Sequence, residues 1–530
     1  MKFKNLTEEV KEKMYQIYWD KEIKWDDRMK MLMEITGKSE RTVRKWCTKL
    51  GFKNKEEIES EDIKIAKERE LNKDKQYYII TYAQNATNVN KALLKNIEAY
   101  AKELDAEIIC IAGRYHNPTT LKKSEKAKNT DYWDSSIQKY LSLKRHDIHK
   151  TVSIMSDVKI QATAVTPLSG LEGMSKENSC VFGHPKVHMK TIPVLEGYAP
   201  KMMLTTGAIT YPNYTDSKAG KKSEFHHQYG FVIVEIESEN ITHIRQVTAK
   251  QSGNFYDLYY KVSNGNVEKN ESIEALVLGD LHYGNEDENV MDCTIEMLEI
   301  LNPNTVVLHD VFDGQSISHH TINDPFKQYG LEITGKNNLE EEVNYMLQRL
   351  WDFTTIDNVV IVRSNHDCHL DKFLLNDWRK LPTSKNSMTY MKYSQILLEQ
   401  HASGNVRGVI PHLINEQYPK FKCLGYGDSY KVKDIELSQH GDVGTNGSRG
   451  SINQFRKLNT KIITAHTHSP ARFDNAVCVG TSTKLRLSYN KGASSWLNSH
   501  AIIHKDGKIQ QIHFVGNNKN YTTLHNDKEF

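Results

Sequence analysis

The sequence predicts a mixed α/β protein that opens with a helical segment. Three observations predict this fold class: helical periodicity through the first 74 residues, a strand–helix–strand pattern that starts near residue 75, and, after residue 269, short β-branched runs that end in polar residues. A chain of 530 residues is too long for one ordinary core, so two to four domains are expected. The predicted regions are 1–74, 75–268 and 269–530.

The first region has the layout of a helix-turn-helix motif. Apolar residues recur at helical spacing from Val10 to Tyr18, and a second helix is expected over 25–35. Gly37 offers a turn, and Ser39 an N-cap for a third helix that runs to Leu50. The outer face of this third helix is basic and is the candidate DNA-binding surface: Arg41, Arg44, Lys45 and Lys49.

An alternative explains the same segment without DNA. The inward residues Val43, Trp46 and Leu50 could pack a small bundle whose basic face is only solvated. The highly charged stretch that follows, up to residue 74, is expected to be a helical or flexible linker.

The second region begins with a β-α-β pattern. Strands are expected at "YYIITYA" and "AEIICIAG", with a helix between them whose inward residues are Leu93, Leu94, Ile97 and Leu104. No G-x-G-x-x-G follows the first strand, so no dinucleotide site is expected. Four histidines lie further on, at a spacing that favours surface or core positions over metal ligands: His184, His188, His226 and His227. The sequence does not indicate the role of this region.

In the third region, five strand-like runs each lead into residue types that bind metals. Sites in open α/β sheets form outside the carboxyl ends of strands, so these side chains are expected to meet. The candidate ligands are Asp280, His282, Asp310, Asn365, His440, His466 and His468. Any one of them alone is more often a turn residue or a surface histidine, but their joint occurrence favours one metal cluster.

This order of motifs resembles that of the calcineurin-like metallophosphoesterase superfamily. The family pattern is D-x-H, G-D-x-x-D, G-N-H-[DE], a lone His often followed by Gly, and G-H-x-H. The matching segments are Asp280–His282, Asp310–Asp313, Asn365–Asp367, His440–Gly441 and His466–His468. The resemblance covers about residues 271–500 and implies a β-sandwich flanked by helices.

Three glycines of the family pattern are replaced, by His309, Ser364 and Ala465. Serine and alanine are small enough to be tolerated. His309 is larger, so either the backbone beside Asp310 differs or His309 adds a group to the site.

The resemblance implies two divalent cations. One would be held by Asp280, His282 and His468, the other by Asn365, His440 and His466, with Asp310 bridging both. Mixed oxygen and imidazole ligands suit such ions, and the absence of thiolate argues against a purely structural zinc site. Mn²⁺ is expected on family grounds, with Fe, Zn²⁺ and Mg²⁺ as alternatives.

The resemblance also implies a mechanism. A hydroxide bridging the metals would attack phosphorus in line. His366 resembles the family's general acid, and Asp367 is expected to orient its ring and raise its pKa. Asp313 and His309 are expected to lie behind the ligands and support them.

Within the superfamily, the segments "GDLHYGN" and "HDVFDG" look closest to SbcD-type repair nucleases. The whole chain also resembles the early host-DNA-degrading nucleases of T-five-like bacteriophages. A two-metal DNA nuclease that self-associates is therefore expected; a partner ATPase of the SbcC type has no visible sequence correlate. The alternatives are a phosphatase or a small-molecule or cyclic-nucleotide phosphodiesterase of the same fold, and a DNA-binding or scaffold protein with a vestigial site.

Composition narrows the setting. No apolar run approaches the roughly 20 residues that span a bilayer, and the first residues lack a signal-peptide pattern. The seven cysteines include no C-x-x-C pair, so neither a disulfide framework nor a zinc ribbon is expected. These features indicate a cytoplasmic protein, in the host cytoplasm if it comes from a phage. The net charge of +3 does not by itself imply a nucleic-acid partner.

Overall fold

The computed structural model describes residues 3–20, 22–50, 52, 61–114, 132–319, 321–376 and 384–525. The chain divides into two compact units, 1–64 and 65–530. Part of the predicted charged linker, residues 53–60, lies outside the described residues.

Unit 1 is a small helical bundle. Its helices are α1 (Glu8–Trp19), α2 (Trp25–Thr36) and α3 (Glu40–Lys49), and α4 (Glu61–Glu68) runs across the boundary to unit 2. Gly37 ends α2 with φ 61°, and its N–H donates to the Met33 carbonyl at 2.8 Å, a left-handed helix end that glycine adopts without strain. Val43 and Trp46 are buried in the bundle core, as predicted. Helix α2, the turn at Gly37 and helix α3 therefore follow one another in the order of a helix-turn-helix layout.

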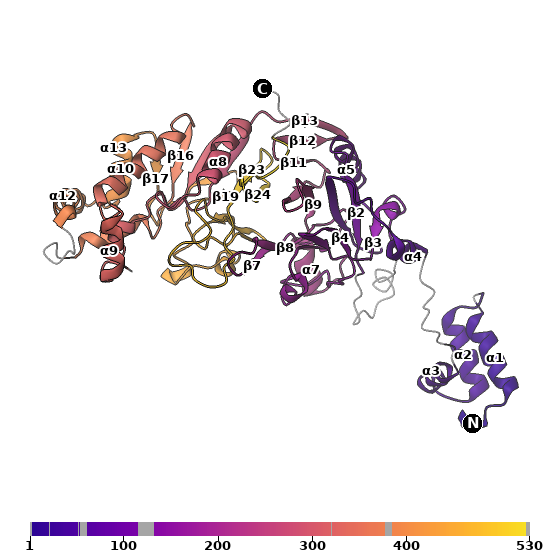
Figure 1. Cartoon of the computed structure of the whole chain (residues 1–530). Coiled ribbons are helices and arrows are strands. Elements are labelled where there is room, and N and C mark those ends of the chain that lie inside the picture. Colours follow the sequence, from indigo (N-terminus) through magenta and orange to yellow (C-terminus); the bar gives the residue numbers. More distant parts are fainter. Residues whose placement is uncertain are drawn as a thin grey trace. The chain divides into compact units, whose positions relative to one another are not determined.

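Unit 2 is a mixed α/β body built, in its described part, on three sheets (Figure 1). An eight-stranded sheet begins with the predicted β-α-β unit, β1 (Tyr77–Ala83), α5 (Lys91–Glu103) and β2 (Glu107–Ala112), whose strands are parallel. The sheet order is β13-β12-β11-β10-β9-β1-β2-β3. Its other strands are β3 (Leu141–Ser142), β9 (Tyr229–Ile236), β10 (Thr242–Ala249), β11 (Phe255–Asp257), β12 (Tyr260–Ser263) and β13 (Asn266–Lys269).

A six-stranded sheet, in the order β17-β16-β15-β14-β23-β24, supplies most of the predicted strand ends. Its four parallel strands are consecutive in sequence, so their carboxyl ends share one edge. The strands are β14 (Ile273–Val277), β15 (Pro303–Leu308), β16 (Asn358–Ile361), β17 (Lys422–Cys423), β23 (Ser499–Ile503) and β24 (Ile509–His513). Helices follow or connect them: α8 (Glu288–Leu301), α9 (Pro325–Ile333), α10 (Leu339–Arg349), α11 (Asp367–Leu374), α12 (Ser387–Ser403) and α13 (Val409–Gln417).

A ten-stranded sheet draws strands from both sides of the predicted boundary at residue 268. Its order is β18-β19-β20-β22-β21-β7-β8-β6-β5-β4, and the join is the antiparallel pair of β7 with β21. Its strands are β4 (His146–His149), β5 (Val152–Ile154), β6 (Ser179–Phe182), β7 (Met189–Ile192), β8 (Lys201–Thr205), β18 (Lys431–Val432), β19 (Ile435–Glu436), β20 (Lys461–Thr464), β21 (Ala471–Phe473) and β22 (Ala476–Cys478). The regions predicted as 75–268 and 269–530 are thus parts of one compact unit.

The ten-stranded sheet is shared between two hydrophobic cores. One core joins it to the six-stranded sheet through residues such as Val277, Val307 and Ile463. The other joins it to the eight-stranded sheet through residues such as Ile80, Val181 and Val232. Unit 2 therefore contains two β-sandwiches, and the ten-stranded sheet takes part in both.

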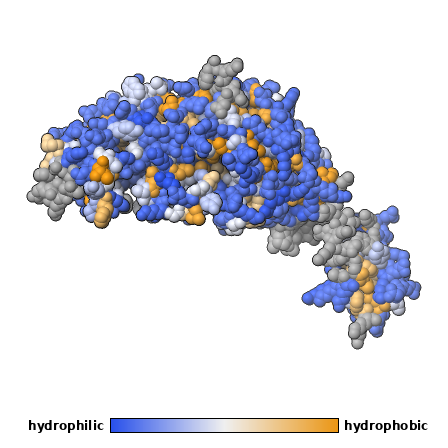
Figure 2. All heavy atoms as spheres, viewed as in Figure 1, coloured by the Kyte–Doolittle hydropathy of each residue, from blue (hydrophilic) through white to orange (hydrophobic). Residues whose placement is uncertain are grey.

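Shorter helices complete the chain: α7 (Lys218–Phe225), α14 (Ile452–Phe455), η1 (Phe3–Asn5), η2 (Gln138–Tyr140), η3 (Glu172–Ser175), η4 (Gln315–Ile317), η5 (Leu350–Phe353), η7 (Ser384–Asn386) and η8 (Thr445–Gly447). On the face drawn in Figure 2, hydrophilic residues predominate and hydrophobic ones occur in small groups. Within the described chain, every helix is too short or too polar to cross a membrane.

Candidate metal centre

The predicted ligands follow the strand ends and converge. Three sets of ionisable side chains each bring their ligand-type atoms within 4.8 Å of one another. The sets are Asp280, His282, Asp310 and His468; Asp310, His440 and His466; and His282, Asp313 and His366. The first two sets contain the residues that the sequence assigns to two separate cations, apart from Asn365, and they share Asp310.

In the first set the imidazoles of His282 and His468 face each other. Their Nε2 atoms are 3.1 Å apart, and His468 Nε2 is 3.2 Å from Asp280 Oδ2. The other ring nitrogen of His282 donates to Asp313 Oδ1 at 3.1 Å. That contact fixes the ring so that Nε2 points into the cluster, which is the supporting position expected of Asp313.

Asp310 lies between the two sets. Its Oδ2 is 3.4 Å from His282 Nε2 on one side and 3.1 Å from His440 Nε2 on the other. The His366 backbone N–H donates to Asp310 Oδ1 at 3.4 Å. This is the position that a bridging carboxylate needs.

Several buried oxygen atoms of the cluster lack a hydrogen bond. Both carboxylate oxygens of Asp280 and the side-chain oxygen of Asn365 have no hydrogen-bond donor, although imidazole nitrogens lie 3.2 and 3.8 Å from Asp280. Buried polar atoms normally find partners, because leaving one unpaired costs about 1–3 kcal/mol. Oxygen and imidazole donors that converge without pairing fit divalent cations, so the residues present suit the group that the sequence predicts.

The backbone is strained at the same place. Four of the candidate ligands, His282, Asp310, His466 and His468, have positive φ angles of 44°, 46°, 73° and 55°. Each such conformation costs on the order of 1–3 kcal/mol for a residue with a side chain. Strain of this kind concentrates at functional sites, where surrounding structure holds the side chains in place.

The charges of the cluster are out of balance without cations. Burial alone would lower the pKa of both imidazoles, yet Asp310 and the neighbouring carboxylates raise the pKa of His282 to about 9 and that of His440 to about 10. Conversely, burial would raise the pKa of Asp310, but His440 and His282 hold it well below its usual range. Protons therefore occupy a place that metal ions would compete for.

His366 lies beside the cluster, but its surroundings differ from the expectation. Its Nδ1 donates to the backbone carbonyl of Asp313 at 2.8 Å, whereas the Asp367 carboxylate accepts from the Phe312 backbone N–H at 3.2 Å. Burial and the neighbouring His282 lower the pKa of His366 to about 4. The prediction that Asp367 orients this ring and raises its pKa is therefore wrong: Asp313 orients it, and Asp367 braces the loop that carries Asp310.

His309 adds a group to the site. It is fully buried, and its Nδ1 is 3.5 Å from Nδ1 of His440. His309 thus stands directly behind a candidate ligand.

Ser364 stands at another replaced glycine. Its hydroxyl accepts from the Asp367 backbone N–H at 3.1 Å and so supports the start of α11.

The sequence did not single out three neighbours of the cluster. Asn285 donates to Asp313 Oδ2 at 2.7 Å, the His369 ring lies 4.4 Å from that of His366, and the Trp496 ring lies 4.1 Å from that of His468. The spacing of His366 and His369, one helical turn apart, is a signal that could have found the second of these. Trp496 is separated from every motif, so no local pattern marks it.

The basic residues proposed for DNA lie in unit 1. Arg41, Arg44, Lys45 and Lys49 are all exposed. Arg44 also pairs with Glu40 at 2.6 Å. The basic face is therefore accessible, with part of its charge already compensated.

The middle-region histidines occupy core positions. His184 and His188 are fully buried, and His188 Nε2 is 3.1 Å from Asp474 Oδ1. His227 bonds to the Thr210 carbonyl at 3.0 Å, and His226 is partly buried. Among the described residues, none of these four belongs to a group of metal-binding geometry.

Comparison with known proteins yields one informative similarity. No family model matches the chain. The chain is 29% identical over 479 residues to a protein named Protein A1 from Escherichia phage T5, and the match covers 82% of this chain and 81% of that protein. One solved structure aligns over 46% of this chain and 98% of its own chain, at 9% sequence identity. Its TM-score of 0.24 is too low to indicate a shared fold. The similarity to Protein A1 makes an origin in a bacteriophage plausible.

Proposed function

We propose that unit 2 is a two-metal phosphoesterase of the calcineurin-like type and that it cleaves DNA. The observation that carries the proposal is the convergence of separately encoded ligand-type residues around Asp310, with buried oxygen atoms left unpaired. Divalent cations bound there, with Mn²⁺ as the first choice, would polarise the phosphoryl group and activate a water molecule.

The protein's own residues would divide the work. Asp280, His282 and His468 would hold one cation, and Asn365, His440 and His466 the other. Asp310 would hold both. Because these residues follow the ends of sheet strands, they would hold a phosphodiester in a fixed position.

His366 would protonate the leaving oxygen. Because its Nδ1 is held by the Asp313 carbonyl, Nε2 is the nitrogen left to carry and deliver a proton. Burial lowers the pKa of His366 to about 4 in the free protein, so the ring would take up its proton only beside the negative charge of a bound phosphate.

Two features favour DNA as the substrate. The exposed basic helix of unit 1 offers charge for a phosphate backbone. The motif spelling resembles that of nucleases, including those that degrade host DNA during phage infection. The protein is also proposed to self-associate, and light scattering on the purified protein would test this.

The direct test is incubation of the purified protein with plasmid DNA, bis-nitrophenyl phosphate and nitrophenyl phosphate, each with Mn²⁺ or with EDTA. We expect metal-dependent cleavage of DNA, abolished by Asp310→Asn. Cleavage of the monoester with intact DNA would instead support a phosphatase. A protein inactive on all three with Mn²⁺, Fe²⁺, Zn²⁺ or Mg²⁺ would contradict the proposal.

A further inference from the structure

Unit 2 also contains a polar pocket, which lies apart from the candidate metal cluster. It encloses about 770 Å³, a volume in the range of small-molecule sites. Lys461 at the amino end of β20 lines it, whereas His466 and His468 follow the carboxyl end of the same strand. The pocket and the cluster are therefore at opposite ends of β20, and the proposed hydrolysis does not use the pocket.

The lining of the pocket has an excess of positive charge. Two carboxylates line it, Asp434 and Asp474, and each is already paired, with Lys461 at 2.8 Å and with Arg456 at 2.5 Å. Six cationic side chains line it: Lys431, Arg456, Lys457, Lys461, Arg472 and Lys508. Among the described residues, the other four cations have no carboxylate within ion-pair distance, so the cavity suits an anion.

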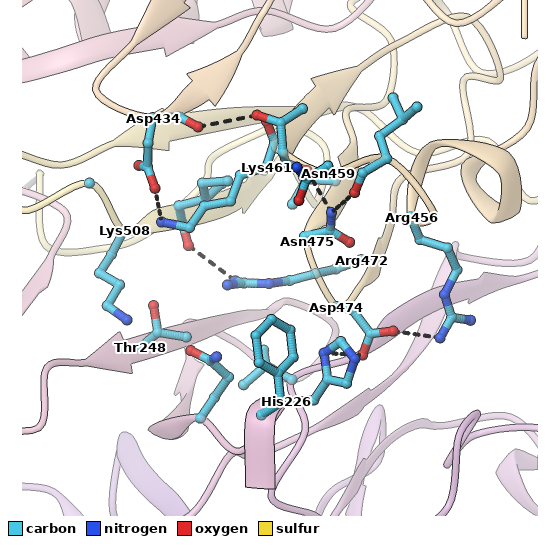
Figure 3. Close-up of a pocket in the computed structure, with 18 of the residues that line it drawn as sticks. His226, Thr248, Asp434, Arg456, Asn459, Lys461, Arg472, Asp474, Asn475 and Lys508 are labelled. Carbon is cyan, nitrogen blue, oxygen red and sulfur yellow. Dashed lines mark hydrogen bonds and ion pairs between the residues drawn. The ribbon is translucent and has the colours of Figure 1, made fainter. Parts of the chain in front are cut away.

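Arg472 is the strongest sign of a ligand. Its side chain is 7% exposed, Nη1 donates to the Ile509 carbonyl at 3.0 Å, and Nε has no hydrogen-bond partner. Figure 3 shows the guanidinium in the middle of the pocket, pointing toward the side where Lys508 lies. Burial lowers the pKa of Arg472 to about 10 and also lowers that of Lys508. A buried cation without a counter-charge is costly, and a bound anion would relieve that cost.

Other lining groups indicate what kind of anion fits. Phe225, at the end of α7, is 82% exposed and lines the pocket beside His226. In proteins that bind nucleic acids, aromatic side chains stack against the bases while nearby cations bind the phosphates. Asn459 and Thr248 add neutral hydrogen-bonding groups (Figure 3). Inorganic phosphate alone would leave most of the cavity unfilled.

We propose that this pocket binds a phosphorylated nucleotide, with Arg472 and Lys508 on its phosphate and Phe225 against its base. Two sources supply this chemistry: a free nucleotide, such as a product of DNA degradation, or the terminal nucleotide of a DNA strand with a 5′-phosphate. In both cases a site outside the metal cluster holds the phosphate.

Calorimetry on the full chain in EDTA would test the site, because without cations the metal cluster cannot hold phosphate through a metal. The probes are deoxyadenosine monophosphate, deoxyadenosine, inorganic phosphate, and a short single strand with or without a 5′-phosphate. We expect the nucleotide to bind and deoxyadenosine not to bind. Arg472→Gln and Lys508→Gln should each weaken binding about tenfold or more, since hydrogen bonds to charged groups are the strong ones.

Lys505→Gln is the matched control, because Lys505 is exposed and does not line the pocket; it should leave binding unchanged. If Arg472→Gln fails to fold, the half-buried Lys508 carries the test. Binding of only the 5′-phosphorylated strand, with the same dependence on the two variants, would support the strand end as the source. The proposal is overturned if no probe binds, if phosphate alone binds as tightly as the nucleotide, or if both variants bind like the wild type. Plasmid cleavage, measured separately, reports on the metal centre.

Discussion

Unit 2 buries two groups of charged side chains, and they are built on opposite principles. In the first, Arg245 lies between Glu235 and Asp257, all at most 2% exposed. In the second, Asp280 and Asp310 lie among histidines at the strand ends. Both groups pay a desolvation cost, but they offset it in different ways.

The Arg245 network is closed. The guanidinium donates to Glu235 at 2.7 Å and to Asp257 at 2.8 and 2.9 Å. Neutral groups satisfy the remaining carboxylate positions: Tyr100, Gln510 and Thr522, each at 2.7 Å. No charged atom of this network is left without a partner. Its geometry stabilises the fold and leaves nothing to bind a ligand.

The candidate metal cluster is open. Asp280 has no hydrogen-bond donor, and positive φ angles hold Asp310 and three of the histidines. The contrast teaches that burial of charge alone does not identify a functional site. Unpaired atoms and backbone strain in the same place distinguish a site prepared for a ligand from one that only joins strands.

The largest expected effect separates these two groups by activity. Asp310→Asn removes one buried charge at almost constant shape and should lower DNA cleavage by roughly 10³-fold or more, because the bridging ligand is lost. The melting temperature of the metal-free protein should fall at neutral pH, because Asp310 balances the charge of the protonated His282 and His440. Circular dichroism at the assay temperature would show that the variant is still folded. Cleavage at the wild-type rate would contradict the two-metal interpretation.

The second prediction tests which part of the open cluster handles protons. His366→Asn should lower the turnover of DNA by roughly 10²–10⁴-fold, the usual contribution of a general acid. Metal content should persist, because His366 is assigned no cation. A nitrophenyl diester, whose leaving group needs little protonation, serves as the control and should lose far less. Equal losses on both substrates would make His366 a ligand or a structural residue.

The third prediction concerns the closed network. Arg245→Met leaves two buried carboxylates unpaired and should lower the free energy of unfolding by about 3–5 kcal/mol. Urea unfolding would measure this effect. Arg407→Met, in the exposed pair with Asp428, is the matched control and should cost less than about 1 kcal/mol. Similar costs for both variants would remove the distinction drawn between closed and exposed pairs.

The smallest expected effect concerns the basic helix α3 of unit 1, whose cationic side chains are exposed. Changing Arg41, Arg44, Lys45 and Lys49 to Gln should weaken DNA binding and flatten its salt dependence by up to about four phosphate contacts. Hydrolysis of a small diester should not change. Four lysines outside α3 supply the control set: Lys11, Lys13, Lys24 and Lys30. An unchanged salt slope would reassign the basic helix to protein contacts.

The sequence predicted the strands and the residues that converge in the candidate cluster because both signals are local. Val306–Leu308 is an apolar run that contains two β-branched valines, and Asp310 follows two residues later, so position along the chain carries the information. Helical spacing placed Val43 and Trp46 inward for the same reason.

Long-range pairing could not be predicted in this way. Nothing beside Arg472 shows that it pairs with Met189 of β7, or that Lys508 faces the same cavity. The role assigned to Asp367 failed because sequence adjacency to His366 does not specify direction, and the first turn of α11 points that carboxylate at the Phe312 backbone.

The pairing of β7 with β21 has a consequence for synthesis. While a ribosome makes the chain, one edge of β7 stays unpaired until residues 471–473 have emerged. The buried carboxylate of Glu235 likewise lacks one hydrogen-bond donor until Thr522, 287 positions later, has been added. Open strand edges are where nascent chains aggregate. Unit 1, by contrast, completes its core by Phe52. Slower translation or added chaperones should therefore raise the soluble yield of the whole chain far more than that of residues 1–52 expressed alone.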